Sequence, residues 1–415
     1  MRIAIIQAAL SVSGGGERQA INLTRELRVA GFDAVLYSFR FNPATCFPDE
    51  VRGLPVVSLP EIPPPFYKKF FRVPFIGFLL QSAYDNRLAR RLAALIPDDT
   101  EILNPHDQTS CRTAYYFKKR HPHTPAVLML NDLHTASWSL FDAPLFGRKR
   151  KSIFKMPFYR LRDFYERRVF WKSIDQIAVL NERTTQILKR ETWRDSVVVR
   201  SGVSAERFPF RARAPLDKSK EIRLLTHGIF YIHRRFEDII RVVALLHDAG
   251  YSAHLQIVGD YMHRDIARAY YEKLRELVRE LHLENSVTFS GVVSDAELLS
   301  AYYQSDIFIS AAHMQTWGLA VFEALATGLP AVISQTIGAA EVLKDGETAL
   351  FIEPGNPASI ARAVRKLAYD GALYERLNKD GAAFVRANLS WKKYAADMQT
   401  VFEKTLQKRS AAYSK

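Results

Sequence analysis

Apolar runs and helix-like segments alternate along the whole chain. The opening run Ile3-Ala4-Ile5-Ile6 predicts a buried strand, and residues 17–30 carry apolar side chains at helical spacing before Gly31 ends the helix. The next strand is predicted over 34–39. A strand, a helix and a strand in this order predict parallel strands that are joined by crossover helices.

The alternation continues in two series. Further strands are predicted over 101–104, 126–130, 176–180 and 197–200 in the first series, and over 222–227, 254–258, 286–289, 307–310 and 331–334 in the second. The polar stretch 205–220 contains Pro209 and Pro215 and predicts a linker. We therefore expect an α/β protein with two doubly wound domains, 1–204 and 221–390, and a terminal helix over 391–415 that packs back toward the first domain.

Composition narrows the class of protein. The 415 residues include only two cysteines, too few for a disulfide framework or a zinc cluster, which suits a reducing cytoplasm. The longest apolar stretch of the first half, 73–80, is far shorter than the roughly 20 residues of a membrane-spanning helix. The first strand begins at once, without the pattern of a signal peptide. A cytoplasmic protein is expected.

Most of the net charge of +14 lies in two segments. Residues 62–91 carry a net charge of +5 and residues 148–172 a net charge of +8, and aromatic side chains are interleaved with the basic ones. Such a surface would suit an anionic membrane, a lipid diphosphate or a nucleic acid. The alternative is a pair of solvated basic helices whose aromatic side chains pack inward.

Glycines 14–16 follow the first strand and precede its helix. They lack the third glycine of a dinucleotide fingerprint, and the second strand ends without the acidic residue that would hold a ribose, so a nicotinamide dehydrogenase is not expected. Backbone N–H groups at such a turn can still bind phosphate. A tight turn without a ligand is the alternative.

The most specific pattern lies at residues 313–346. Gln315 and Glu323 stand eight residues apart, with Gly318-Leu319 between them, and this segment resembles the donor-binding motif of the retaining, GT-B-fold glycosyltransferases of family 4. In that family two glutamates eight apart flank a Phe-Gly-Leu turn. The resemblance extends to GGGER at 14–18, SGVSAERF at 201–208 and SDAELLSAYYQSDIFISAA at 294–312.

The resemblance implies an acceptor-binding first domain, a second domain that binds a UDP- or GDP-linked sugar, and a donor held between them. Glu323 would accept hydrogen bonds from the ribose, while Gln315, in place of the first glutamate, would meet sugar hydroxyls without a negative charge. The backbone amides of Trp317, Gly318 and Leu319 would face the sugar and phosphates. Gly15 and Gly16 are further candidate donor-binding residues, because the N–H groups of their turn can approach a phosphate.

A second matching segment spans residues 227–246. The family carries an arginine and a lysine here that brace the leaving diphosphate; in this chain Ile229 replaces the arginine, and Arg234 and Arg235 fall at or next to the lysine position. Cations at this point stabilise the charge that grows on the diphosphate in the transition state. Both arginines are predicted site residues, with the assignment between them open.

The acceptor domain offers fewer matches. His106, Asp132 and His134 follow predicted strands, at the edge where an α/β sheet opens its crevice, and are candidate site members. The resemblance implies transfer with retention, in which the leaving phosphate takes the proton of the acceptor. It implies no protein nucleophile, metal or cofactor, and no Asp-x-Asp motif is evident.

The sequence therefore predicts a hexosyltransferase that extends a glycan or a lipid-linked acceptor in cell-surface polysaccharide or glycoconjugate synthesis. The segments 62–91 and 148–172 would hold it on the inner face of the cytoplasmic membrane. One alternative is a soluble transferase with a small-molecule acceptor. Another is a non-catalytic protein that binds polyanions, although nucleic acid is not the expected partner.

Overall fold

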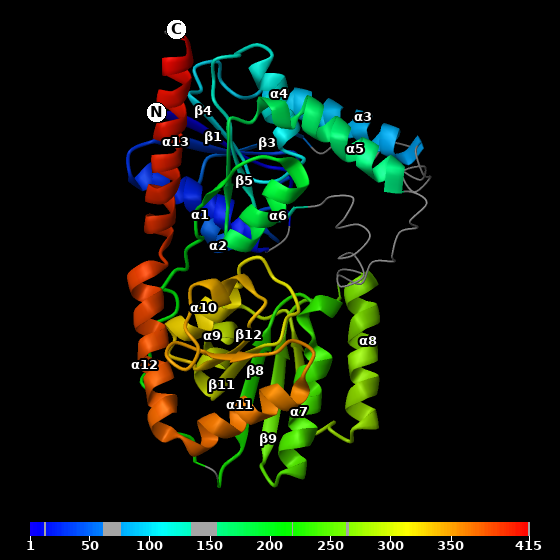
Figure 1. The fold of residues 1–415 in the computed structure, drawn as a ribbon, viewed down its shortest axis with the longest axis vertical. Helices are drawn as coiled ribbons and strands as arrows, with labels where there is room; N and C mark the ends of the chain where they lie inside the picture. Colours follow the sequence, from blue (N-terminus) through cyan, green and yellow to red (C-terminus); the bar gives the residue numbers. More distant parts are fainter. Residues whose placement is uncertain (12–13, 61–75, 134–155, 218, 263–264, 414–415) are drawn as a thin grey trace. The chain divides into compact units, whose positions relative to one another are not determined.

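The computed structural model describes residues 1–11, 14–60, 76–133, 156–217, 219–262 and 265–413, which form two compact units (Figure 1). Of the described residues, the first unit contains those up to Gly202 together with the terminal segment from Trp391. The second unit contains Val203–Ser390. Each unit is an α/β structure whose strands are parallel.

The strands of the first unit lie in two sheets of parallel strands, ordered β3-β2-β1-β4 and β5-β6-β7. A bridge between Leu103 and Ala126 links β4 to β5. The bounds are β1 (Arg2–Gln7), β2 (Asp33–Ser38), β3 (Val56–Ser58), β4 (Ile102–Pro105), β5 (Val127–Leu130), β6 (Gln176–Val179) and β7 (Val197–Val198). The predicted strands are confirmed. The sequence missed β3, because three half-buried residues form no apolar run.

Helices cover the sheets of the first unit. They are α1 (Gly15–Val29), α2 (Pro48–Val51), α3 (Ile76–Ala93), α4 (Cys111–Lys118), α5 (Met156–Val169) and α6 (Glu182–Thr192), with a 3-10 turn at Trp171–Ser173. The terminal helix α13 (Trp391–Tyr413) also belongs here. Arg409 of α13 pairs with Asp175 and donates a hydrogen bond to the carbonyl of Pro122.

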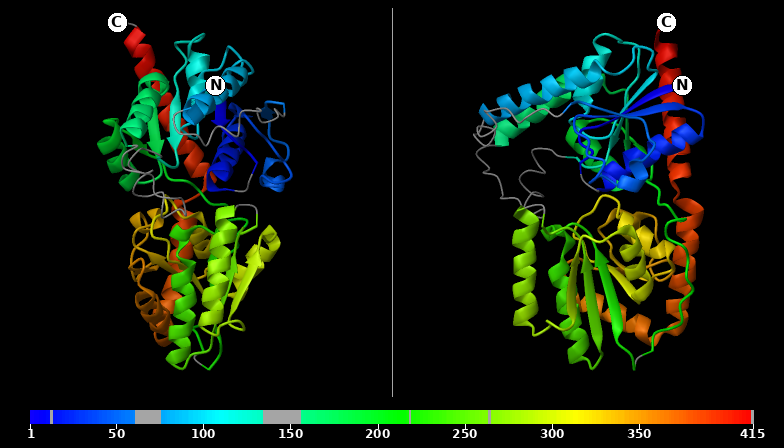
Figure 2. Two further views of the ribbon diagram at one scale, coloured as in Figure 1. Left: turned by 90° about the vertical axis from the view of Figure 1, so that its right-hand side faces the viewer. Right: turned by 180° about the vertical axis from the view of Figure 1, so that it is seen from behind.

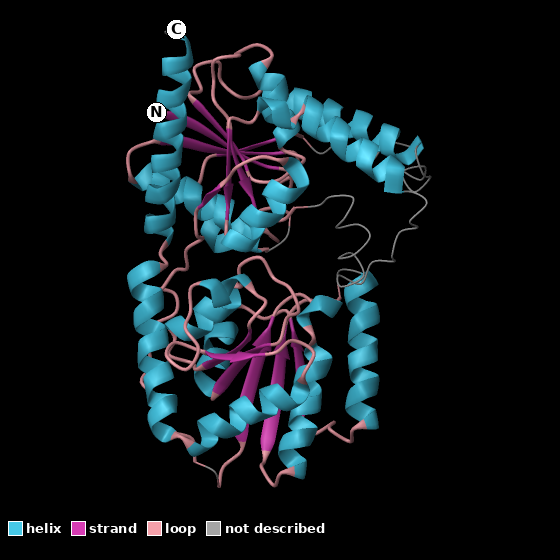
Figure 3. Ribbon diagram, in the orientation of Figure 1, coloured by secondary structure: helices cyan, strands magenta, loops and turns pink. Residues whose placement is uncertain are grey.

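The second unit has one sheet of six parallel strands, ordered β10-β9-β8-β11-β12-β13, with helices on both sides (Figure 3). Its strands are β8 (Ile222–His227), β9 (Ala253–Val258), β10 (Val287–Gly291), β11 (Ile307–Ser310), β12 (Ala331–Ser334) and β13 (Leu350–Ile352). Its helices are α7 (Phe236–Asp248), α8 (Asp265–Glu280), α9 (Asp295–Gln304), α10 (Leu319–Ala326), α11 (Pro357–Tyr369) and α12 (Gly371–Asn388), with 3-10 turns at Ile232–Arg234 and Gly338–Glu341. Of the six strands of this unit, the sequence predicted all except β13.

This strand order places a topological switch point between β8 and β11. Chain connections leave these two central strands in opposite directions, so the loops that follow them separate and open a crevice at the carboxyl edge. The equivalent point of the first unit lies between β1 and β4. Ligand-binding residues are therefore expected after these four strands.

Residues 205–217, which the sequence assigned to a linker, are held against the second unit. Arg211 N donates to Thr327 O at 3.0 Å, and the Arg213 guanidinium donates to Tyr302 O at 2.7 Å and to Ser305 O. Prolines block regular structure here but leave these donors available, and the segment pairs them with carbonyls at the ends of α9 and α10.

Candidate functional site

Two loops of the second unit meet at its switch point. One follows β8 and runs from Gly228 to Arg235, and the other follows β11 and runs from Ala311 to Gly318. His313 N donates a hydrogen bond to His233 O at 2.8 Å, which joins the two loops. The predicted donor-binding residues of the second unit thus lie at one edge of its sheet.

A close backbone contact shapes this edge. A β-carbon on Gly259 would lie 1.9 Å from Gly228 O, so no side chain fits there, and both glycines have positive φ angles, 151° and 155°. The guanidinium of Arg234 lies beside Gly228, 3.2 Å from where a β-carbon would stand. Gly228 therefore leaves room for the Arg234 guanidinium, and Gly259 leaves room for the carbonyl of Gly228. Sequence reasoning missed both of them, although Gly228 and Gly259 each directly follow a predicted strand.

The structure gives the two predicted arginines different surroundings. Arg235 has φ +57°, precedes the first turn of α7, and donates to both carboxylate oxygens of Asp238 at 2.7 and 2.8 Å. Its guanidinium also lies 3.4 Å from Glu237. Arg235 is thus paired with the carboxylates of its own helix, and the guanidinium of Arg234 lies beside Gly228 at the switch point.

His233 lies between these loops without adding charge. Its side chain is buried, and burial, together with the neighbouring charge of Arg234, lowers its pKa to about 2. His233 is therefore neutral at physiological pH. His233 therefore adds no second positive charge beside Arg234.

The turn before α10 carries polar atoms that suit a ligand. Gly318 has φ +105° and precedes the first residue of α10, Leu319, and Gly338 N donates to Gln315 O at 2.8 Å. Among the described residues, the buried Gln315 Oε1 and Trp317 Nε1 have no hydrogen-bond partner. Such an atom costs about 1–3 kcal/mol when it is left unsatisfied, which makes this turn a candidate binding surface.

Glu323 lies one turn further along α10. Its side chain is buried, and Tyr302 Oη donates to one of its carboxylate oxygens at 3.1 Å. Glu323 shares a helical stripe with Leu319, because positions four apart lie on the same side of a helix. The predicted donor residues of the second unit therefore gather around the first turns of α10.

The carboxyl edge of the first unit brings together its own predicted residues. Gly15 and Gly16 begin α1, and a β-carbon on Gly16 would lie 3.4 Å from the Asn131 amide nitrogen, next to the exposed Asp132. Asp107, which was not selected from the sequence, accepts hydrogen bonds from Ala8 N and Ser110 N, both at 2.8 Å. It ties the end of β1 to the start of α4. Its position after a strand was the available signal.

His106, a candidate site residue, is buried and does not reach the surface where a ligand would exchange protons with it. It is 1% exposed, its Nε2 lies 2.9 Å from Asn104 Oδ1, and burial lowers its pKa to about 3. The structure thus shows a neutral histidine packed beneath the edge. His134 lies outside the described residues.

Two features are absent from the described part of the chain, a membrane-spanning helix and a metal-binding cluster. None of its helices combines the length and the apolar character that crossing a bilayer requires. No group of three or more His, Cys, Asp and Glu side chains gathers there in a way that could hold a metal ion.

Comparison with known families identifies this arrangement. The family model described as Glycosyltransferase Family 4 matches residues 13–207, and that described as Glycosyl transferases group 1 matches residues 209–384. The chain belongs to the group 1 glycosyl transferases. The two matches together span both units, as the sequence resemblance predicted.

Curated relatives are similar over parts of their length. Mannosylfructose-phosphate synthase of Agrobacterium fabrum is 29% identical over 150 residues, which are 36% of this chain and 33% of that protein. Glycogen synthase of Mycobacterium tuberculosis is 26% identical over 205 residues, which are 49% of this chain and 47% of that protein. The lipopolysaccharide core biosynthesis glycosyltransferase LpsD of Rhizobium meliloti is 27% identical over 253 residues, which are 60% of this chain and 70% of that protein. The chain therefore spans a third to a half of the first two relatives.

Solved structures show the same fold over nearly the whole chain. Sucrose-phosphate synthase of Thermosynechococcus elongatus has a TM-score of 0.73 at 17% identity, covering 97% of this group 1 chain and 99% of its own. Anabaena HepE in complex with UDP has a TM-score of 0.72 at 15% identity, covering 97% and 100%. The predicted GT-B fold class is confirmed.

Proposed function

We propose that this group 1 protein transfers a hexose from a nucleotide sugar to a hydroxyl of a glycan or lipid-linked acceptor. The observation that carries the proposal is Arg234, which stands beside Gly228 at the same sheet edge as the unpartnered polar atoms of Gln315 and Trp317. A cation for a diphosphate and neutral hydrogen-bonding groups for a sugar thus occur side by side.

We assign one part of the donor to each group. Arg234 would brace the diphosphate, Gln315 and the amides of Gly318 and Leu319 would meet the sugar, and Glu323 would accept hydrogen bonds from the ribose. Glu323 accepts a hydrogen bond from Tyr302, and a carboxylate has acceptor sites for more than one donor. We assign a phosphate-binding role to the amides of Gly15 and Gly16, at the first turn of α1.

UDP is the nucleotide we propose first. Three solved structures with this fold are of Anabaena HepE, with UDP, with UDP and glucose, and with UDP-glucose. A GDP-linked donor is the alternative that a binding screen must test.

We propose that transfer proceeds with retention of the anomeric configuration. The bond between the anomeric carbon and the phosphate oxygen breaks, a bond to the acceptor oxygen forms on the same side of the sugar, and the acceptor proton passes to the leaving phosphate. Arg234 acts where negative charge grows, because a fixed cation in a partly buried site stabilises the leaving group more in the transition state than in the ground state. Asp132, the exposed carboxylate of the other unit, is the group we propose for contact with the acceptor.

The acceptor class follows from charge and from the relatives. LpsD is named as an enzyme of lipopolysaccharide core biosynthesis, and residues 62–91 and 148–172 form basic, aromatic segments. We therefore propose an acceptor at an anionic membrane surface on the cytoplasmic side. A water-soluble phosphorylated acceptor is the second candidate, because mannosylfructose-phosphate synthase is also similar.

A thermal-shift screen of the purified chain against UDP, GDP, ADP and CMP and their sugars tests the donor assignment. A ligand that binds only the folded state raises the melting temperature by mass action. We expect a shift with UDP-glucose or another UDP-sugar, and its loss in Glu323→Ala with the fold intact by circular dichroism. A well-folded chain that responds to none of these ligands would contradict the proposal and support the non-catalytic alternative.

A further inference from the structure

Helix α5 exposes apolar side chains and buries charged ones. Leu161, Phe164 and Tyr165 are 61%, 63% and 41% exposed, and their spacing of three and four residues forms one stripe along the helix. On the other side, Asp163 is buried and Glu166 pairs with the buried Arg112 of α4. Arg160 and Arg168 of the same helix are also exposed, so a basic helix presents an apolar stripe to solvent, which marks the stripe as an interaction surface.

Helix α3 runs beside α5 and adds to this surface (Figure 2). The rings of Phe78 and Phe158 pack edge to face at 5.8 Å, near the first residues of both helices. In the same turns, Ile76 and Leu79 of α3 are 53% and 51% exposed. Two neighbouring helices therefore present apolar side chains to solvent.

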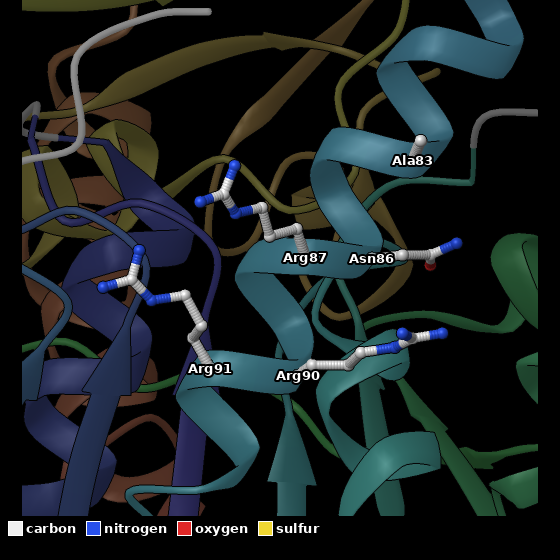
Figure 4. Close-up of a pocket in the computed structure, with 5 residues that line it drawn as sticks. All are labelled: Ala83, Asn86, Arg87, Arg90 and Arg91. Atoms are coloured by element: carbon white, nitrogen blue, oxygen red, sulfur yellow. The ribbon is translucent and has the colours of Figure 1, made fainter.

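Further along α3, an arginine cluster replaces the apolar side chains. A pocket of about 480 Å³ is lined by Ala83, Asn86, Arg87, Arg90 and Arg91. Figure 4 shows Arg87 and Arg91 extending side by side from one flank of α3, with Asn86 and Arg90 on the other. Three cations thus lie within two turns of one helix.

The polar groups of the pocket are hydrogen-bond donors. Asn86 Oδ1 already accepts from the Arg112 guanidinium at 2.8 Å, which leaves its amide hydrogens, and Arg90 stacks over the ring of Tyr116 at 4.7 Å. Within the described residues, neither Arg87 nor Arg91 has a carboxylate within ion-pair distance. A site that contains donors and positive charge selects an anion, and guanidinium groups suit the oxygens of a phosphate.

The arginines and the exposed apolar side chains lie on the same pair of neighbouring helices. Leu79 and Arg87 are eight residues apart, about 12 Å along a helix. An interfacial helix lies in the plane of the membrane surface, so groups at different points along it meet the headgroup region together. The apolar residues and the arginines can therefore contact one bilayer surface at the same time.

We propose that the pocket of Arg87, Arg90 and Arg91 binds the phosphate of an anionic lipid while the apolar residues of α3 and α5 enter the bilayer interface. This inference deepens the proposed function, because it rests on an acceptor at a membrane surface and names the contact that would hold the enzyme there. The phosphate belongs to the bilayer, since the same exposed region carries both apolar and cationic groups.

Sedimentation with phosphatidylcholine vesicles that contain phosphatidylglycerol tests the proposal. We compare the full chain with Arg87→Ala/Arg91→Ala. Each cation near an anionic surface is worth about a fivefold factor in partition, so the double variant should bind about thirtyfold more weakly. The matched control is Arg362→Ala/Lys366→Ala, which removes two exposed cations four residues apart on α11 of the second unit and should change partition less than twofold.

The outcomes separate the alternatives. Equal losses in both double variants, or no loss in either, would overturn the pocket and leave general charge as the cause. Arginine-dependent binding of glycerol phosphate by calorimetry, without binding to the vesicles, would overturn the lipid source in favour of a soluble phosphate. UDP-sugar binding, measured in parallel by thermal shift, is expected to survive in both variants. A wild-type chain that binds UDP-sugar but no vesicle refutes this inference alone, whereas vesicle binding without any nucleotide-sugar binding refutes the proposed function and leaves the pocket standing.

Discussion

Replacing Arg234 and Arg235 one at a time should separate ligand binding from stability. Arg235 donates two hydrogen bonds to Asp238, whose side chain is 2% exposed, while the Arg235 side chain is itself 31% exposed. Hydrogen bonds to charged groups contribute about 1.5–3 kcal/mol, and partial exposure places this pair near 2 kcal/mol. We expect Arg235→Ala to lower the melting temperature of the second unit by about 4–8 °C.

A glycine at the same position provides an internal check on this reasoning. Arg235 has φ +57°, a conformation that costs a residue with a β-carbon about 1 kcal/mol or more. Arg235→Gly loses the same ion pair but avoids this cost, so it should recover about half of the stability that Arg235→Ala loses. Differential scanning calorimetry of the two variants measures the difference.

Arg234→Ala should show the opposite behaviour. Its guanidinium lies at the switch point beside Gly228, so we expect a change of less than about 2 °C in melting temperature. Loss of one charged contact to a diphosphate should weaken UDP binding about 10- to 100-fold, which isothermal titration calorimetry measures. The reasoning is refuted if Arg235→Ala keeps its stability and loses UDP affinity while Arg234→Ala does the reverse.

Three further predictions concern single positions. Glu323→Gln keeps an acceptor for Tyr302 but loses the charge, so UDP-sugar affinity should fall about tenfold by calorimetry with an unchanged melting curve; unchanged affinity would contradict the ribose assignment. Gly259→Ala places a β-carbon 1.9 Å from Gly228 O and should lower the free energy of unfolding by about 3 kcal/mol or more in urea denaturation. A wild-type midpoint would show that the segments after β8 and β9 can separate freely. Burial lowers the pKa of His106 to about 3 from 6.5. Between these two pH values the unfolded chain binds a proton that the native chain does not. The free energy of unfolding should therefore fall by roughly 1.4 kcal/mol per pH unit as the pH drops from 6.5 toward 3. His106→Gln should remove that contribution from the pH dependence of urea midpoints, and an unaltered slope would show that His106 is protonated in the folded chain.

Much of the fold was predictable because its signals are local. Parallel strands that are buried on both sides read as short apolar runs, and helices between them repeat every three or four residues, so alternation alone indicated two doubly wound units. The failures have the same origin. β3 and β13 have three residues each, too few to show a pattern. Residues 205–217 are polar in sequence, yet their arginines reach carbonyls of α9 and α10 that no local signal reveals.

The residues of the candidate site likewise differ in how far the sequence alone could predict them. Gln315, Trp317 and Glu323 are close in sequence, so a turn and one helix suffice to bring them together, and the resemblance found them. Choosing between Arg234 and Arg235 required backbone angles and the positions of Asp238 and Gly228, which show the carboxylate that holds one guanidinium and the glycine that lies beside the other.

The sequence by itself determined the family, the two-unit architecture and the excess of basic residues, because each follows from residue type and from spacing along the chain. Only the tertiary structure decided which side chains are exposed. The aromatic residues of α5 were expected to face either a membrane or the core; Arg112 on α4 draws Glu166 inward and turns Phe164 outward. That orientation depends on a charge 54 residues away in sequence, and a helical pattern alone carries no information about the neighbour against which the helix packs.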